Sequence, residues 1–413
     1  MNDLSAPLSP QTRRYTQKRD AILDAAAVLF NQKGLKGTTL AAVADSVGLM
    51  TNSVTYYYRK KEELATAGLL RSIASLQALV EAAATEATPQ ARVTRLFRLF
   101  YERAAAIAAG TSPPQMNFGD VRALTSPHVE TVFGAYTTLF RKIRTLLVED
   151  EAHRPPRADA NARAHLVLSA LNSTRVFIGR YDPESYGRVA DRISDMLLHG
   201  LAGPGSTWTD RRLPDQAWSF TDDPAREAFL RSATRLINEQ GYRGASVEKI
   251  SARLNVTKGS FYHHNETKDD LVAQCFTRSY AVVRRVQAIA EQAGTTGWER
   301  TCLAAAELVR YQLSDDGPLL RNSAFAALPE NLHDQMKKHL DWLAERFGSM
   351  VVDGMMDGSI RPLDSAIAAQ LVNNMVNAAA ELPWWIPGVT VENAAEAYAR
   401  PLFVGLFAAP ATD

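Results

Sequence analysis

The sequence predicts an all-α protein built from two similar modules in tandem, each with a three-helix head followed by a helical body. The first observation is an internal repeat, because GLKG at 34–37 returns as GYRG at 241–244, an offset of 207 residues from Gly34 to Gly241. The second is that apolar residues recur at helical spacing in both halves. Each repeat spans about half of the 413 residues, which is the size of a whole domain.

The register of the repeat sets the expected domain boundaries. The offset pairs Lys61 with Lys268, and a slightly shorter offset of 205 pairs Asn172 with Asn377 near the end of each half. A polar stretch rich in Gly and Pro separates the halves, as linkers often do. We expect a flexible arm at 1–17, a first head at 18–66, a first body at 67–202, a linker at 203–223, a second head at 224–273 and a second body at 274–409.

Composition limits the classes of function. The chain has 46 basic and 45 acidic residues, so any surface that binds nucleic acid must be local. Cys275 and Cys302 are expected to be reduced, apolar thiols, and no Cys/His spacing indicates a metal site. The sequence has no signal peptide, no membrane-length apolar run and no catalytic or cofactor-binding motif. We therefore expect a soluble, cytoplasmic protein that is not an enzyme and needs no cofactor.

The first head is predicted to contain three helices before a fourth, longer one. An apolar stripe through 22–30 predicts a helix that ends at Gly34, since glycine accepts the left-handed conformation of a helix end. Thr39 can cap a short second helix that ends near Gly48. A third helix is predicted from Thr51 through 57, and a long helix opens near Lys61. Two short helices joined by a tight turn are typical of a helix-turn-helix.

The second head has the same pattern. An apolar stripe through 229–237 ends at Gly241, and Ser246 can cap the next short helix. Asn255 replaces the turn glycine, and asparagine also tolerates that backbone conformation.

These segments carry a recognisable motif. The second copy has VTKGSFYHH at 256–264 and KDDL at 268–271, while the first copy keeps KEEL at 61–64. Both segments resemble the DNA-binding domain of TetR-type transcriptional regulators over roughly 18–66 and 226–273. The first copy departs from the family pattern, with Thr55 where tyrosine is usual and Tyr57-Tyr58 where His-Phe is usual.

The resemblance implies which residues meet DNA. A recognition helix in the major groove presents short polar side chains to base edges, while hydroxyls and lysines contact phosphates. The expected groove-facing residues are Thr51, Asn52, Ser53, Thr55, Lys258, Gly259, Ser260 and Tyr262. The expected phosphate anchors are Thr39, Tyr57, Tyr58, Lys61, Ser246, His264 and Lys268, and Tyr56 and His263 complete the predicted set. The alternative is that the tyrosines and histidines only pack the small head core.

The two heads differ in charge. Residues 13–61 contain nine basic and three acidic side chains, whereas residues 226–268 contain eight and four. Since each neutralised phosphate adds to affinity, the first head, with its Arg13-Arg14 arm, should be the stronger anchor. The arm could equally be a solvated tail.

The bodies are expected to supply both a ligand pocket and the assembly. The resemblance implies that helices at 164–177 and 189–201 pack on those at 366–382 and 391–407, which makes one chain an intramolecular pseudo-dimer and leaves a homodimer of such chains open. A small hydrophobic or amphipathic effector is implied. The candidate ligand-binding residues are Phe97, Phe100, Met116, Phe118, Phe133, Asn172, Arg175, Trp342 and Trp384, each of which could instead be core or interface. For Arg175 an ion pair at the interface is favoured over a ligand carboxylate.

The expected function is therefore a sequence-specific DNA-binding regulator, a repressor released by its effector. The alternative is a ligand-sensing or protein-interaction co-regulator with one or both heads degenerate.

Overall fold

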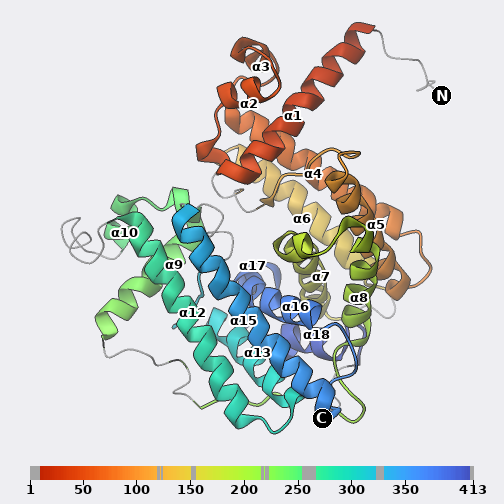
Figure 1. Ribbon diagram of the computed structural model, residues 1–413, viewed down its shortest axis with the longest axis vertical. Helices are drawn as coiled ribbons and strands as arrows, with labels where there is room; N and C mark the ends of the chain where they lie inside the picture. The colour runs from red at the N-terminus through yellow and green to blue at the C-terminus, as the bar shows by residue number, and fades with distance from the viewer. Residues whose placement is uncertain are drawn as a thin grey trace.

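The computed structural model describes residues 10–118, 121, 124–149, 155–214, 218, 223–253, 267–321 and 330–409. These residues form helices joined by turns and loops, and one isolated bridge pairs Ala202 with Ile360. Within these ranges no helix has the length and apolar character that a bilayer crossing requires. The prediction of an all-α fold is confirmed (Figure 1).

The two copies contain corresponding helices. The first copy comprises α1 (Pro10–Gly37), α2 (Leu40–Ser46), α3 (Thr51–Tyr57), α4 (Lys61–Ala83), α5 (Pro89–Ala108), α6 (His128–Leu146), α7 (Arg157–Phe177), η2 (Ile178–Arg180), η3 (Pro183–Ser185) and α8 (Tyr186–His199). The second comprises α9 (Pro224–Gly244), α10 (Val247–Arg253), α12 (Lys268–Ala293), α13 (Gly297–Leu313), α15 (Glu330–Asp357), α16 (Ser365–Ala378), η5 (Ala379–Glu381), α17 (Leu382–Trp385), η6 (Ala395–Ala399) and α18 (Arg400–Val404).

The first head follows the local signals of its sequence except at its start, where α1 begins at Pro10, inside the arm expected to be flexible at 1–17. The backbone of α1 bends at Gly34, where φ is 64°, and the Thr39 hydroxyl caps α2 by accepting the Ala42 amide at 3.1 Å. Val43 and Val54, both fully buried, join α2 and α3 to the apolar stripe of α1. The second head begins in the same way, because the backbone of α9 bends at Gly241, where φ is 73°.

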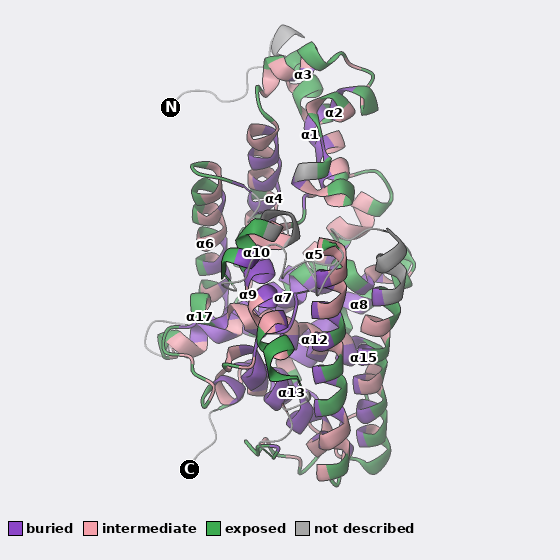
Figure 2. Cartoon of the chain, turned by 90° about the vertical axis from the view of Figure 1, so that its left-hand side faces the viewer, coloured by how far each residue is buried: buried purple, intermediate pink, exposed green. Residues whose placement is uncertain are grey.

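The second half of each body forms a junction between the copies. Helix α7 packs along α16, and α8 packs along α16 and α18. The Asn374 amide donates to the Ser169 carbonyl at 2.9 Å, and the ring nitrogen Nδ1 of His165 lies 3.1 Å from the Tyr398 hydroxyl. Buried residues continue across this region in one core, so the two bodies are packed as parts of a single unit (Figure 2).

Two glycines in equivalent positions permit a close approach of the two backbones at this junction. A Cβ on Gly200 would lie 2.3 Å from the Phe403 carbonyl oxygen, and a Cβ on Gly405 would lie 2.5 Å from the Leu198 carbonyl oxygen. Both glycines also have positive φ, 68° and 102°, which disfavours other residues.

Each copy also donates a backbone hydrogen bond to the other at this contact. The Leu201 amide donates to the Phe403 carbonyl at 2.7 Å, and the Leu406 amide donates to the Leu197 carbonyl at 2.8 Å. We call these four residues, with Gly200 and Gly405, the copy junction.

The last helix differs from the expectation of a continuous helix over 391–407. The structure has a π-helical turn, η6, followed by the short helix α18, which ends before Gly405. Pro401 lies just after the π turn. Because proline lacks an N–H and its ring crowds the carbonyl of the preceding turn, a widened turn accommodates it better than a regular one.

Candidate DNA-binding heads and ligand cavity

The predicted recognition helix of the first head, α3, projects its polar side chains outward. Val54 is its one buried residue, while Thr51 and Asn52 are exposed and Ser53 and Thr55 are partly exposed. The helix lies at the far end of the molecule, away from both bodies (Figure 1). Short polar side chains on the free face of a short helix are what a major groove can accept.

The three consecutive tyrosines of this head are not equivalent. Tyr56 is 76% exposed, whereas Tyr57 and Tyr58 are partly buried against the core. The centroid of the Tyr57 ring lies 4.8 Å from that of Tyr15 in α1. The pKa of Tyr57 is raised, first by desolvation and then by the neighbouring Tyr15 and Tyr56. Tyr56 is therefore the freest of the three, and Tyr57 and Tyr58 support α3 as well as flanking it. Tyr15 was missed by the sequence reasoning because it precedes the matched motif.

The flanking anchors lie around the start of α4 and α2. Arg59 and Lys60, just before α4, are exposed, and Lys61, its first residue, is partly exposed. The Arg59 amide donates to a Glu63 carboxylate oxygen at 3.0 Å, which orders the entry to this helix. The exposed Thr39 caps α2. The first head thus has three consecutive cations between the end of α3 and the first residue of α4.

The second head is described only in part. The Ser246 hydroxyl accepts the Lys249 amide at 3.3 Å at the start of α10, and Lys268 opens α12. A capping box between Thr267 and Asp270 begins that helix. The predicted contacts Lys258, Gly259, Ser260, Tyr262, His263 and His264 lie outside the described residues.

An asparagine ties the first head to its body. The Asn31 side chain in α1 donates to the Gln115 carbonyl and accepts the Asn117 amide, both at 2.8 Å. Between these residues, the Met116 amide donates to the Ser72 hydroxyl at 2.8 Å. We call this set of hydrogen bonds the head clasp.

The second head has the same clasp. Asn238 in α9 donates to the Leu319 carbonyl at 2.8 Å and accepts the Arg321 amide at 3.0 Å, and the Leu320 amide donates to the Ser279 hydroxyl at 2.8 Å. In each copy the loop after the second body helix is therefore bound directly to the first helix of the head. Movement of this loop must strain the clasp.

The predicted ligand-binding residues fall into separate environments. Phe97 is fully buried, and Met116 is 4% exposed, so both are core residues. Phe100 is partly buried against the same core. Trp342 is 49% exposed on α15, apart from the others.

A second group of these residues surrounds Tyr136. Its ring centroid lies 5.2 Å from that of Phe118, and its hydroxyl accepts the Asn172 amide at 3.0 Å. Arg175 donates to the Met116 carbonyl at 3.5 Å, rather than to a carboxylate among the described residues. Desolvation lowers the Arg175 pKa to about 10.

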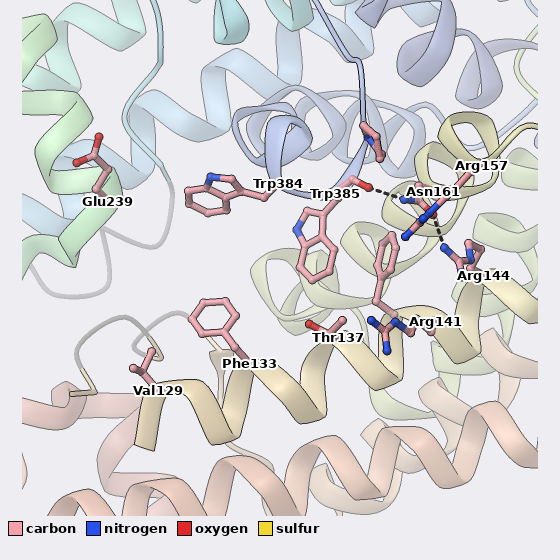
Figure 3. A pocket seen from close by; sticks show the side chains of 12 residues that line it. Val129, Phe133, Thr137, Arg141, Arg144, Arg157, Asn161, Glu239, Trp384 and Trp385 are labelled. Atoms are coloured by element: carbon pink, nitrogen blue, oxygen red, sulfur yellow. Dashed lines mark hydrogen bonds between the residues drawn. The ribbon is translucent and has the colours of Figure 1, made fainter. Parts of the chain in front are cut away.

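Phe133 and Trp384 meet in a cavity of ≈ 570 Å³ between the two copies. We call it the inter-copy cavity (Figure 3). Its lining residues come from α6, α7, α9, α17 and the segment after α17, and they are Val129, Phe133, Thr137, Phe140, Arg141, Arg144, Arg157, Asn161, Glu239, Trp384, Trp385 and Pro387.

A short chain of contacts builds the floor of this cavity. Arg144 donates to the Asn161 side-chain oxygen at 2.9 Å, and the Asn161 amide donates to the Trp385 carbonyl at 2.6 Å. The Trp385 ring stacks on Phe140 with centroids 4.5 Å apart. Sequence reasoning missed the three arginines, because arginines on the polar side of a helix give no signal of a pocket.

The described residues offer no metal site or reactive thiol. They contain no group of three or more His, Cys, Asp or Glu that could hold a metal ion. Cys275 and Cys302 are buried and unpaired, and burial raises the pKa of Cys275 to about 11 and that of Cys302 well above its usual value. Both are protonated and poorly nucleophilic at neutral pH.

Comparison with known proteins identifies the heads. The family model described as bacterial regulatory proteins, tetR family, matches residues 22–67 and again residues 229–275. The HTH-type transcriptional repressor DhaR of Mycobacterium sp. (strain GP1) is 26% identical over 141 residues, covering 33% of this chain and 71% of that protein. The HTH-type transcriptional repressor KstR2 of Mycolicibacterium smegmatis is 36% identical over 59 residues, covering 14% and 28%.

A solved structure is also similar to part of the chain. The crystal structure of AibR in complex with isovaleryl coenzyme A and operator DNA has 20% sequence identity and a TM-score of 0.37, covering 44% of this chain and 98% of that one. The repeated family match and the helix-turn-helix geometry of the first head agree. The two heads therefore belong to the TetR family of bacterial regulatory proteins, and the chain carries them in tandem.

Proposed function

We propose that this protein is a repressor that binds an operator with two different heads and is released by a small effector. The exposed polar face of α3, flanked by Arg59, Lys60 and Lys61, is the observation that carries this proposal. DhaR and KstR2, which are similar to this chain, are both named transcriptional repressors. DNA binding by such a head combines base contacts from the helix with phosphate contacts from its flanks.

One chain supplies both halves of the functional assembly in this proposal. The reciprocal contacts of the copy junction support it, because they join equivalent helices of the two copies as a subunit interface would. Packing within one chain also avoids much of the entropic cost of bringing two chains together.

The two heads should read two different half-sites. The first head presents TNSVT at 51–55, whereas the sequence at 258–262 of the second is KGSFY, with different donors and acceptors. Identical subunits would read a palindrome; this chain should not.

Selection of genomic fragments with the full chain, followed by footprinting, tests the DNA-binding proposal. We expect two unlike half-sites, and Asn52→Ala should cost roughly 1–3 kcal/mol at one base pair of one half-site. Two identical inverted half-sites would contradict the asymmetric operator. Failure to retain any fragment at low salt would favour a co-regulator without DNA binding.

Cutting the chain tests the single-chain assembly. A protease site inserted at the exposed Gly205 should yield two fragments that still sediment together. The double variant Gly200→Leu/Gly405→Leu, whose side chains would clash with the facing backbone, should let the same fragments separate. Fragments that separate without those substitutions would contradict the proposal.

A further inference from the structure

The inter-copy cavity differs in character from one end to the other. Arg141, Arg144 and Arg157 lie together with Asn161 on one side, while Val129, Phe133 and Trp384 lie on the other (Figure 3). We call these the cationic end and the aromatic end. We propose that this cavity binds an amphipathic organic anion, with its acidic group among the arginines and its aromatic or acyl body against Trp384 and Phe133.

The cationic end is built to receive an anion. Arg144 is held by Asn161, which is 5% exposed and is itself fixed by the Trp385 carbonyl. Arg141 and Arg157 are exposed, and their side chains form no ion pair or hydrogen bond with the described residues. Three guanidinium groups from two helices can bind the oxygens of a carboxylate, sulfonate or phosphate by charge-assisted hydrogen bonds.

Competition from protein carboxylates is weak in this cavity. Glu239 is the one acidic residue among those that line it. Its two carboxylate oxygens accept from Arg253 at 2.7 and 3.0 Å, and it lies beyond the aromatic end in Figure 3. Among the residues that line the cavity, no carboxylate therefore pairs with Arg141 or Arg157.

The aromatic end has apolar surface that is exposed to solvent. Trp384 is 56% exposed, and the Arg321 guanidinium lies 5.2 Å from its ring centroid on one face. Trp385, stacked on Phe140, forms the wall between the two ends. A planar or acyl body would remove this surface from water, and ≈ 570 Å³ lies within the usual range of small-molecule cavities.

The sequence repeat does not reproduce this cavity on the opposite side. The offset of 205 that pairs Asn172 with Asn377 places Gly179 and Arg180 opposite Trp384 and Trp385. Arg180 forms an ion pair with Asp341 of α15 instead. The two tryptophans belong to one copy and the three arginines to the other, so the repeat does not place a second such combination among the described residues.

The position of the cavity would allow a bound ligand to act on the second head. Glu239 belongs to α9, the first helix of that head, whereas the other lining residues belong to the two bodies. A ligand that fills the aromatic end would lie between this helix and α17. This regulatory consequence depends on the proposed function, whereas anion binding does not.

The test uses anilinonaphthalene sulfonate and its neutral counterpart, phenylnaphthylamine, titrated by fluorescence into the full chain without DNA. We expect the sulfonate to bind on the order of tenfold more tightly than the neutral compound, because it can form one additional charge-assisted contact. Arg141→Gln/Arg157→Gln should remove this preference and leave binding of the neutral compound unchanged. Trp384→Ala should weaken both compounds.

Matched controls distinguish the cavity from general surface binding. Arg188→Gln, at an exposed position of α8, and Trp342→Ala, at a tryptophan of similar exposure, should change neither affinity. Equal binding of the two compounds by the wild-type chain, no binding of the sulfonate, or a preference that persists in the double arginine variant would each overturn the proposal. Operator binding by the same variants, measured by anisotropy without either compound, reports separately on the proposed DNA-binding function.

Discussion

Arg103 in the first body and Arg310 in the second occupy equivalent positions of the repeat, 207 residues apart, but their surroundings differ. Arg310 is buried and forms ion pairs with Glu307, at 3.3 Å, and with Asp210. Arg103 donates to the Ser75 hydroxyl and has no carboxylate partner among the described residues. Desolvation, followed by the nearby charge of Arg175, lowers the Arg103 pKa to about 10.

This difference indicates how the two copies have diverged in role. In the second body the buried cation is neutralised by Glu307 of the same helix and by Asp210 of the linker, so its role is structural. The first body keeps Arg103, Arg141, Arg157 and Arg175 without carboxylate partners among the described residues. Two of these arginines, Arg141 and Arg157, line the inter-copy cavity, whose tryptophans come from the second copy.

The head clasp, unlike the buried arginines, is the same in both copies. Asn31 and Asn238 make the same pair of hydrogen bonds to equivalent loops, with lengths between 2.8 and 3.0 Å. A feature that joins head to body is thus alike in both copies, while the charges within the bodies differ. The following substitutions test this contrast.

The largest expected effect is at Arg310. Arg310→Met should destabilise the chain by about 3–5 kcal/mol, because it breaks the buried ion pair with Glu307 and the ion pair with Asp210. Arg103→Met should cost far less, since no described carboxylate depends on Arg103. Urea denaturation of the full chain measures both, and Arg310→Met/Glu307→Gln should recover much of the loss. Equal losses at the two arginines would contradict the assigned difference.

Intermediate and equal effects are expected at the clasps. Asn31→Ala and Asn238→Ala should each cost about 1–3 kcal/mol, because each leaves a backbone amide and carbonyl without partners. Thermal unfolding of the two variants compares them directly. Asn52→Ala, at an exposed position, is the matched control and should leave stability unchanged. A loss confined to one clasp would show that the two heads are not held alike.

The smallest effects are expected at the anchoring lysines. Lys61→Ala should weaken binding to all DNA sequences and reduce the salt dependence by about one phosphate contact. Lys268→Ala should do less, because the first head carries more net positive charge. Titrations of operator DNA at several salt concentrations compare the two variants. Equal changes in the salt dependence of binding would show that net charge does not determine which head binds DNA more strongly.

Much of the fold could be predicted from local sequence. The bends at Gly34 and Gly241, the Thr39 cap and the opening of the long helices at Lys61 and Lys268 all lie where predicted. The departure in the last helix arises at Pro401, whose effect on a packed helix was not anticipated. Of the predicted ligand-binding residues, Phe133 and Trp384 are brought together in the inter-copy cavity.

The sequence by itself determined the tandem architecture, the helical heads and the family, because repeats, caps and helix-ending glycines act over a few residues. Only the tertiary structure decided which charges are paired. Arg103 and Arg310 are the same residue at the same place in the repeat, yet Asp210 reaches Arg310 from 100 positions away. The inter-copy cavity likewise joins α6 and α7 to α9 and α17. Contacts between distant segments depend on how the copies pack, and no local pattern records that packing.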